Sequence, residues 1–198
     1  MRVIAGTLRS RPLVAPEGIE TRPTTDRLRE TLFNVLTNPA LDRVAGAGFL
    51  DLYAGSGAVG IEALSRGAAH VFFVEQAVPA LAVLKRNLES LGIRSGFTIE
   101  KRSVAAFLRR ESANPAARRF GVVFLDPPYD SIEYELALGM LGGEGASLLA
   151  EGALVIAEHR KKEPLPVRFG TLRRFRLLQQ GDAGLSFYGV VPAESLAD

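Results

Sequence analysis

The central part of the chain alternates between short apolar runs and longer segments with one apolar face. Apolar runs that favour strands cover residues 48–53, 70–74, 97–101, 122–125 and 153–158. Segments with helical spacing of apolar residues cover residues 58–66, 77–91, 103–110 and 131–141. Strands that alternate with helices form a parallel sheet with helices on both faces, joined by right-handed crossovers. The pattern therefore predicts an α/β fold.

Both ends of the chain depart from this alternation. Residues 2–8 alternate imperfectly before a basic turn, which predicts a short N-terminal hairpin. Residues 24–36 begin with hydroxyl and acidic side chains suited to an N-cap and continue with apolar residues at helical spacing, which predicts an amphipathic helix. Near the C-terminus, two extended runs flank the turn "QQGDAG" and predict an antiparallel hairpin at the sheet edge. We expect an N-terminal extension over residues 1–40 and a main domain over residues 41–198.

The composition narrows the possible chemistry. The 198 residues include no cysteine, which excludes disulfides, thiolate metal ligands and a cysteine nucleophile. No apolar run is long enough to cross a membrane, and the first residues do not have the pattern of an export signal. We therefore expect a cytoplasmic protein with no membrane partner.

The small net charge of +2 conceals separate basic and acidic segments. Residues 1–29 hold six arginines and three acids, residues 101–119 hold six Lys or Arg and one acid, and residues 159–176 hold seven and one. Residues 120–158 hold seven acids and no Lys or Arg. A basic surface assembled from several segments suits a polyanion such as nucleic acid. For any one segment, a solvated loop or face is the alternative.

The stretch "DLYAGSGAVG" begins at Asp51 and joins a predicted strand to a predicted helix. Gly55, Gly57 and Gly60 have the G-x-G-x-x-G spacing of a nucleotide-binding turn. The next strand ends near Glu75, so both acids are expected at the carboxyl ends of neighbouring strands, where such sheets bind ligands. Glu75 is suited to accept hydrogen bonds from a ribose diol, and capping of the next helix is the alternative.

Asp51 distinguishes between two classes of cofactor. An ionised carboxylate about 4–6 Å from a pyrophosphate would repel it by roughly 1 to a few kcal/mol. The same carboxylate would attract the ammonium and sulfonium groups of S-adenosylmethionine. The methionine carboxylate of that cofactor would face the N-terminus of the following helix, where free backbone N–H groups favour an anion. The turn and its two acids therefore favour S-adenosylmethionine over a nicotinamide cofactor.

A second motif, Asp126-Pro127-Pro128-Tyr129, follows the predicted strand 122–125. The prolines stiffen this loop, and a rigid turn with a buried tyrosine is the alternative to a catalytic loop. An exocyclic amine on a nucleobase is a poor nucleophile because its lone pair is delocalised into the ring. We expect the Asp126 side chain and the Pro127 carbonyl to hold the two amine hydrogens and free that lone pair to attack a methyl group. Tyr129 would stack on the flipped base.

These motifs carry a resemblance to a known family. "DLYAGSGAVGIEALSRGA" together with "DPPY" resembles Rossmann-like methyltransferases that act on nucleobase amino groups. The blocks "MRVIAGTLRSRPL", "TRPTTDRLRETLFNVL" and "GDAGLSFY" resemble more narrowly the bacterial RsmD family, which methylates the exocyclic N2 of a guanine in small-subunit ribosomal RNA. The resemblance extends from residue 2 to about residue 190.

The resemblance implies a Rossmann-like fold with a mostly parallel sheet of seven strands, helices on both faces, an antiparallel C-terminal hairpin strand, and a small N-terminal hairpin and helix. The implied cofactor-binding residues are Asp51, Tyr53, Gly55, Ser56, Gly57, Glu75, Ser103 and Val104. The implied catalytic residues are Asp126, Pro127, Pro128 and Tyr129. The implied substrate-binding residues are Arg9, Arg11, Arg22, Pro23 and Thr24. Many relatives have Asp or Asn in place of Ser103, so a backbone contact from Ser103 or Val104 to the adenine is an equal alternative to a side-chain contact.

The function implied is methyl transfer from S-adenosylmethionine to guanine N2 in 16S ribosomal RNA, either free or within a partly assembled small subunit. Asp-Pro-Pro-Tyr equally suits the N6 amine of adenine in DNA or another RNA, so that activity is an alternative. A non-catalytic RNA-binding module and an NAD-dependent oxidoreductase are alternatives of other classes. We expect no metal ion and a monomeric protein.

Overall fold

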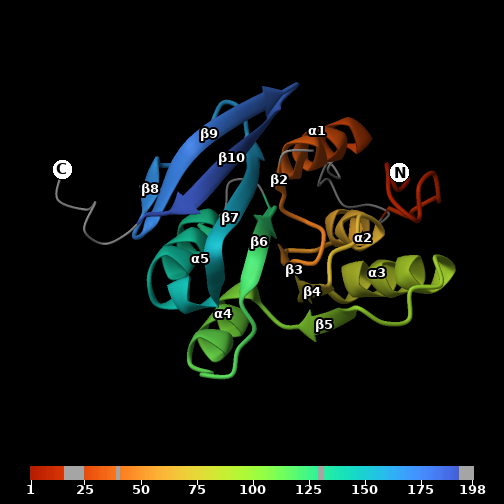
Figure 1. Cartoon of the computed structure of the whole chain (residues 1–198), viewed down its shortest axis with the longest axis horizontal. Coiled ribbons are helices and arrows are strands. Elements are labelled where there is room, and N and C mark those ends of the chain that lie inside the picture. The colour runs from red at the N-terminus through yellow and green to blue at the C-terminus, as the bar shows by residue number, and fades with distance from the viewer. Residues whose placement is uncertain (16–24, 39–40, 129–131, 192–198) are drawn as a thin grey trace.

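The main feature of the computed structural model is an eight-stranded sheet in the order β5-β4-β3-β6-β7-β10-β9-β8 (Figure 1). The structure describes residues 1–15, 25–38, 41–128 and 132–191. The strands are β3 (Gly48–Leu52), β4 (His70–Glu75), β5 (Phe97–Lys101), β6 (Phe120–Leu125), β7 (Leu149–Arg160), β8 (Arg168–Phe169), β9 (Leu172–Gln180) and β10 (Ala183–Val190). The first five in the sheet order are parallel and the last three pair antiparallel. The predicted α/β fold is confirmed.

The five predicted parallel strands are all present, although β4, β6 and β7 are longer than expected. β5 spans the predicted residues 97–101, whereas β7 extends over residues 149–160 instead of 153–158. The C-terminal hairpin is also present, since β9 and β10 pair on either side of a turn at Gly181, which has a φ of 60°. The resemblance implied seven strands, and the additional one is β8, which pairs with the start of β9. Two residues are too few to show a strand periodicity in the sequence.

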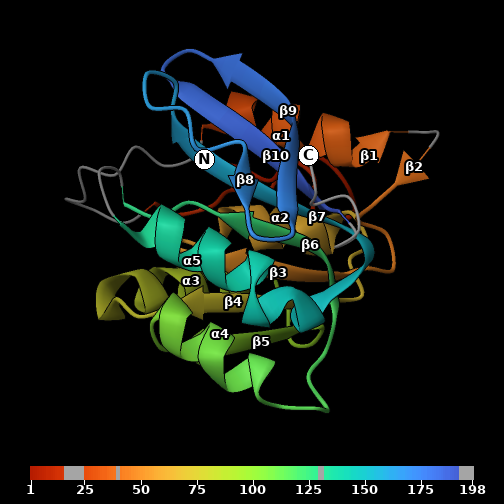
Figure 2. The ribbon, with the colours of Figure 1, turned by 90° about the vertical axis from the view of Figure 1, so that its left-hand side faces the viewer.

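Helices cover both faces of the sheet, as Figures 1 and 2 show. The helices are α1 (Asp26–Leu36), α2 (Ala58–Ser65), α3 (Val78–Ser90), α4 (Val104–Ser112), α5 (Glu133–Gly142) and the 3₁₀ turn η1 (Glu144–Leu148). Side chains of α1, α2 and α3 pack with Phe49 of β3 in one core cluster, and those of α4, α5 and η1 pack with Leu50 in a second. Adjacent residues of β3 serve the two clusters because side chains of a strand alternate between its faces. None of the helices in the described ranges is long and apolar enough to span a membrane.

The N-terminal segment packs against the same core as α1, α2 and α3. The predicted hairpin is reduced to one antiparallel bridge between Arg2 and Pro12, while Val3 and Leu13 are buried in the first core cluster. The predicted amphipathic helix is confirmed as α1, with Thr25 as N-cap accepting a hydrogen bond from the backbone of Leu28. A short two-stranded sheet, β1 (Thr37–Asn38) and β2 (Leu41–Asp42), follows α1.

A buried carboxylate on α2 joins these N-terminal elements. Glu62 is fully buried and accepts hydrogen bonds from the backbone N–H groups of Ile4 at 2.7 Å and Ala5 at 3.0 Å. Its carboxylate also accepts a hydrogen bond from Nε of Arg66 at 2.7 Å. The buried guanidinium of Arg29 on α1 lies 3.9 Å from the same carboxylate. Three segments distant in sequence therefore share one buried negative charge.

We expect Glu62→Gln to lower the free energy of unfolding by about 3 kcal/mol, because loss of one partner from a buried ion pair leaves the other charge uncompensated. Denaturant unfolding at pH 7 measures the change. Glu89→Gln on the exposed face of α3 is the matched control, for which we expect a change within about 0.5 kcal/mol. Equal stability of the two variants would contradict the assigned role of Glu62.

Candidate cofactor and base-binding site

The sheet brings the sequence motifs together at one edge. β3 lies between β4 and β6, with Leu52 opposite both Val74 and Leu125. The three strands are parallel, so the loops after them begin side by side. The glycine turn, Glu75 and the Asp126 loop therefore meet at the carboxyl ends of adjacent strands, as the sequence predicts.

The glycine turn needs two of its glycines for close packing. Gly57 is the N-cap residue of α2, with a φ of 78°, and a Cβ there would lie 2.2 Å from Cδ1 of Leu84. A Cβ on Gly60 would lie 2.3 Å from Cε1 of Phe73 on β4. No side chain caps the N-terminus of α2 at Gly57. The turn therefore brings the amino end of α2 close to the sheet, where Asp51 accepts from the Gly60 N–H and the N-cap position has no side chain of its own.

Asp51 lies beneath this turn on β3. Its side chain is 2% exposed, and its carboxylate accepts a hydrogen bond from the backbone N–H of Gly60 at 2.9 Å. Burial raises the pKa of Asp51 to about 8; the Gly60 hydrogen bond opposes this shift, and the charge of Glu75 adds to it. Near neutral pH the protonated carboxyl is favoured until a cation arrives to stabilise the ionised form. Its role as a counter-charge for a cationic cofactor stays a prediction.

Glu75 connects the end of β4 to the glycine turn. One carboxylate oxygen accepts a hydrogen bond from the Gly55 N–H at 2.9 Å. The other accepts from the N–H groups of Gln76 and Ala77, both at 2.8 Å, just before α3 begins. These N–H groups precede the first turn of α3, which has no side-chain cap bond, so Glu75 orders the approach to the helix without capping it. An ionised carboxylate has about four acceptor positions, so these three bonds leave capacity for a ribose hydroxyl, and that role stays a prediction.

Tyr53 connects the glycine turn to the helix after the Asp126 loop. It has a φ of 60°, a left-handed conformation that is uncommon outside glycine. Its hydroxyl donates a hydrogen bond to Oε2 of Glu133, in the first turn of α5, at 2.6 Å. Burial and the Glu133 carboxylate both raise the pKa of Tyr53, so the hydroxyl keeps its proton. The sequence does not reveal this partner, which lies 80 residues away.

The Asp126 loop begins directly after β6. Asp126 is partly exposed, Pro127 is buried and Pro128 is exposed. The hydroxyl of Tyr134 on α5 lies 3.4 Å from the Pro127 carbonyl oxygen, within hydrogen-bonding distance. Tyr129, the predicted stacking residue, lies outside the described residues. The placement of Asp126 and Pro127 beside the glycine turn fits an amine-binding loop, and their catalytic roles stay predictions.

The remaining predicted cofactor residues lie on neighbouring elements. Ser103 is the N-cap of α4, and its hydroxyl accepts a hydrogen bond from the N–H of Ala106 at 3.3 Å. Val104 is buried. The side chain of Ser103 thus already caps a helix, and a contact from either residue to adenine stays a prediction.

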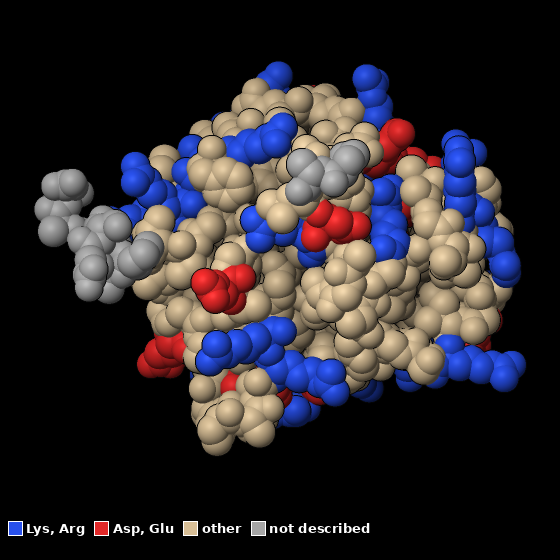
Figure 3. Space-filling view, viewed as in Figure 1, with Lys and Arg blue, Asp and Glu red and all other residues tan. Residues whose placement is uncertain are grey.

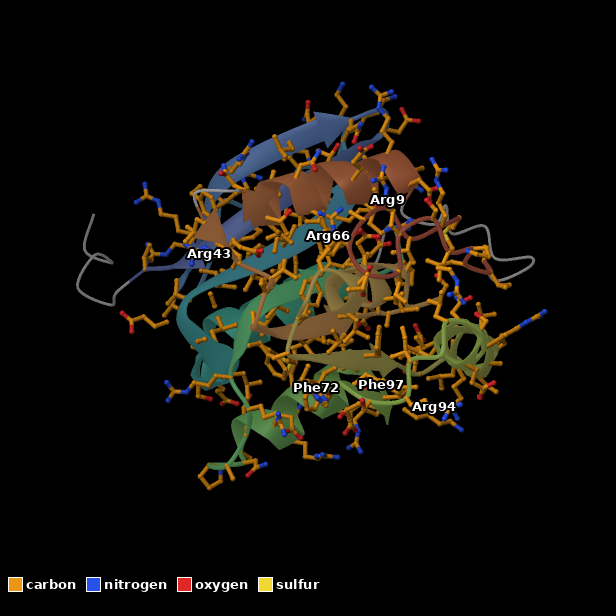
Figure 4. The ribbon with its side chains drawn as sticks, turned by 45° about the vertical axis from the view of Figure 1, so that its right-hand side comes forward. Arg9, Arg43, Arg66, Phe72, Arg94 and Phe97 are labelled. Atoms are coloured by element: carbon orange, nitrogen blue, oxygen red, sulfur yellow. The ribbon has the colours of Figure 1, made fainter. Side chains whose placement is uncertain are left out.

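The predicted substrate residues fall into two groups. Arg22, Pro23 and Thr24 lie outside the described residues. Arg9 lies on the N-terminal segment, which bonds to Ser65 at the far end of α2 from the glycine turn (Figure 4). Arg11 donates a hydrogen bond to the carbonyl oxygen of Ser90 at 3.1 Å. The Arg9 segment is roughly 12 Å from the glycine turn along α2, so an Arg9 contact would be with a substrate that extends well beyond one base.

One residue of this site was missed at the level of sequence. Asn87 on α3 is fully buried, and its amide donates hydrogen bonds to the carbonyl oxygens of Ser56 and Val14, both at 3.0 Å. Its own oxygen accepts from the N–H of Val14 at 2.8 Å. Asn87 thus ties the glycine turn to the N-terminal segment. The available signal was a polar residue on the apolar face that Leu84 and Leu88 define.

Comparison with known proteins agrees with this arrangement. The family model described as "Conserved hypothetical protein 95" matches residues 1–189. The chain is 36% identical to the Haemophilus influenzae protein named ribosomal RNA small subunit methyltransferase D, over 95% of this chain and 91% of that protein. It is 34% identical to the Escherichia coli protein of the same name, over 84% of this chain and 78% of that protein.

Solved structures support the same relationship. The structure of yhhF from Escherichia coli, described as a putative methyltransferase, matches with a TM-score of 0.81 at 31% identity and covers 97% of this chain and 98% of that one. The structure of a Thermus thermophilus protein described as hypothetical matches with a TM-score of 0.74 at 31% identity and covers 94% of this chain and 98% of that one. With the motifs of the glycine turn and the Asp126 loop in place on one sheet edge, this chain belongs to the ribosomal RNA small subunit methyltransferase D (RsmD) family.

Proposed function

We propose that this protein transfers a methyl group from S-adenosylmethionine to the exocyclic N2 amine of a guanine in 16S ribosomal RNA, in the cytoplasm. The observation that carries the proposal is the juxtaposition of Asp51, the glycine turn, Glu75 and Asp126 at the ends of β4, β3 and β6. Membership of the RsmD family supports ribosomal RNA as the substrate.

The residues at this edge fit S-adenosylmethionine, which when bound supplies a methyl group on a positively charged sulfur. The amino end of α2 suits the methionine carboxylate, because its N-cap residue Gly57 has no side chain and Asp51 bonds to the Gly60 N–H of the first turn. Buried Asp51 suits the positive charges. Glu75 suits the ribose hydroxyls and at the same time holds Gly55 through its backbone N–H. The chain therefore offers an anion site, a cation site and a diol acceptor around one turn.

Asp126 and Pro127 activate the target amine by position. The Asp126 carboxylate and one lone pair of the Pro127 carbonyl accept the two amine hydrogens and turn the nitrogen lone pair out of conjugation with the ring. The Tyr134 hydroxyl is placed to occupy the other lone pair of that carbonyl and so to fix its direction. The Asp126 carboxylate would also stabilise the positive charge that develops on nitrogen as the N–C bond forms and the bond from the methyl group to the cofactor sulfur breaks; the nitrogen then loses one of its protons. No covalent enzyme intermediate is involved.

The test of the activity is the product nucleoside. The protein is incubated with labelled S-adenosylmethionine and transcribed 16S ribosomal RNA, both free and in partly assembled small subunits, and the RNA is then digested and analysed by mass spectrometry. We expect N2-methylguanosine. N6-methyladenosine would contradict the proposed target and support the adenine alternative. Binding of NAD with no binding of S-adenosylhomocysteine would support an oxidoreductase instead.

We expect Asp126→Ala to lower the rate of methyl transfer by roughly 100-fold or more, because the variant loses an acceptor needed in the transition state. Its dissociation constant for S-adenosylhomocysteine should stay within about twofold of wild type, since the cofactor residues are unchanged. Glu151→Gln, an exposed acid on β7, is the control for loss of a negative charge. Methyl transfer by Asp126→Ala at the rate of this control would refute the catalytic assignment.

The pKa of Asp51 gives a pH prediction for cofactor binding. Because this pKa is raised to about 8 and the ammonium group of the ligand favours the ionised form, wild-type affinity for S-adenosylhomocysteine should increase as the pH rises from about 6.5 to 8.5. Asp51→Asn keeps an acceptor for Gly60 and does not titrate. The ratio of wild-type to variant affinity, measured by calorimetry, should rise up to about 20-fold over this range, and titration of the ligand cancels in the ratio. A ratio independent of pH would argue against Asp51 as the counter-charge.

A further inference from the structure

A β-bulge in β9 gathers basic and aromatic side chains on one face of the sheet. Arg176 pairs with Phe187 of β10, and the register then shifts, so that Arg173 pairs with Gly189. Phe187 and Gly189 share one face of β10, because they are two residues apart. Cross-strand partners point to the same side, so Arg176 and Arg173 lie on this face too. Without the bulge, strand alternation would place the two arginines on opposite faces.

Phe175 joins the two arginines on this face. It is the residue without a partner at the register shift, and its ring lies 6.4 Å from the ring of Phe187. A Cβ built on Gly189 would lie 3.8 Å from the Phe175 ring, so the glycine beneath it leaves room for the ring. Phe175 is nevertheless 61% exposed. Its ring therefore rests on the sheet and presents a free aromatic surface to solvent.

The neighbouring strand adds a further arginine. Arg168 of β8 pairs directly with Arg173 of β9, and both side chains are exposed. Arg168 donates a hydrogen bond to the carbonyl of Gly170 at 3.1 Å. Within the described part of the chain, no ion pair is recorded for Arg168, Arg173 or Arg176. Like charges directly opposite each other on a sheet are destabilising, and a bound anion between them would relieve the repulsion.

We name the residues Arg168, Arg173, Phe175 and Arg176 the β9 basic face. In Figure 3, lysine and arginine side chains gather over the region where Figure 1 draws β8 and β9. The exposed side chain of Leu177 does not extend this face, because Leu177 pairs with Ser186 and points to the other side of the sheet. The β9 basic face thus consists of one exposed aromatic ring surrounded by arginines. It is not part of a broad apolar patch.

We propose that the β9 basic face binds an unpaired stretch of the substrate RNA, with a phosphate between Arg168 and Arg173 and a base stacked on Phe175. Arginine and an exposed aromatic ring are the pair of groups that sequence-tolerant binding of single-stranded nucleic acid requires. This inference rests on the proposed function for the identity of the polyanion. A partner protein or a second copy of the chain is the competing occupant, and the exposed ring of Phe175 beside arginines that form no ion pair within the described residues favours RNA.

The position of this face explains why it would matter for a large substrate. Gln180, the last residue of β9, pairs with Ala183 of β10, and Ala183 pairs with Arg160, the last residue of β7. β9 therefore ends at the same edge of the sheet as the Asp126 loop. Phe175 is five residues earlier on β9 and three strands across from β6, on the order of 20 Å from the Asp126 loop by strand geometry. One flipped nucleotide cannot reach both places. The β9 basic face therefore selects for an extended RNA and adds affinity without touching the target base.

RNA affinity of single variants tests the proposal. Dissociation constants are measured for transcribed 16S ribosomal RNA, free and in partly assembled small subunits, over a series of salt concentrations. We expect Phe175→Ala to weaken binding about tenfold with an unchanged salt slope, and Phe175→Tyr to restore it, because stacking is lost and regained. We expect Arg173→Gln and Arg168→Gln each to reduce the slope of log affinity against log salt by about 1.

Two variants serve as matched controls. Arg94→Gln removes an exposed arginine from the loop before β5, at the opposite end of the sheet (Figure 4). Leu177→Ala removes an exposed apolar side chain from the other face of β9. Affinity for S-adenosylhomocysteine and the circular dichroism spectrum should match wild type in every variant, which separates RNA binding from folding.

The outcomes distinguish this inference from the proposed function. If wild type forms N2-methylguanosine while Phe175→Ala and Arg173→Gln bind RNA as the controls do, RNA binding at the β9 basic face is refuted and the proposed function stands. If wild type binds no RNA, both fail. If Phe175→Ala changes the sedimentation of the protein without RNA, the face binds a second copy of the chain, and RNA binding there is refuted.

Discussion

The charge of a carboxylate in the protein interior must be compensated by nearby groups. Glu62 is fully buried, and the N-terminal segment provides two of the groups that compensate its charge, so this segment packs as part of the core. Taking this charge out of water is unfavourable unless hydrogen bonds and cations replace the lost solvation. Backbone N–H groups of residues 4 and 5, Arg66 and the guanidinium of Arg29 provide that replacement. The position of α2 therefore depends on the N-terminal segment and on α1. Since the amino end of α2 closes the glycine turn, the cofactor site depends on elements that precede it in sequence.

The glycine turn is held from three directions by groups outside it. Glu75 at the end of β4 accepts from Gly55, Asn87 on α3 donates to the carbonyl of Ser56, and Tyr53 bonds to Glu133 on α5. These contacts fix the turn before any ligand arrives, and a turn that is already ordered loses less entropy on binding. The bond to α5 also fixes the distance between the cofactor turn and the loop after β6. The glycine turn is thereby linked through Tyr53 to the helix that follows the Asp126 loop.

The two ends of the sheet serve different purposes. The parallel end places the glycine turn, Glu75 and the Asp126 loop at the carboxyl ends of β3, β4 and β6, where the strand order reverses and such sheets bind ligands. At the antiparallel end, the outermost strands carry arginines and an exposed phenylalanine. A bulge in β9 determines which side those residues face. The proposed binding of RNA on the β9 basic face would use the sheet itself as part of the RNA-binding surface.

The sequence by itself determined the five parallel strands, the helices between them, their order and the edge at which the motifs meet, because local periodicity and strand ends are encoded over a few neighbouring residues. The residues predicted for β5 are those observed, and Asp51, Glu75 and Asp126 lie at adjacent strand ends as expected. Only the tertiary structure decided the contacts of Asn87, the partner of Tyr53, the reduction of the N-terminal hairpin to one bridge, and the bulge and extra strand at the sheet edge. Each of these depends on groups brought together by packing, from positions whose spacing in the sequence carries no periodic signal.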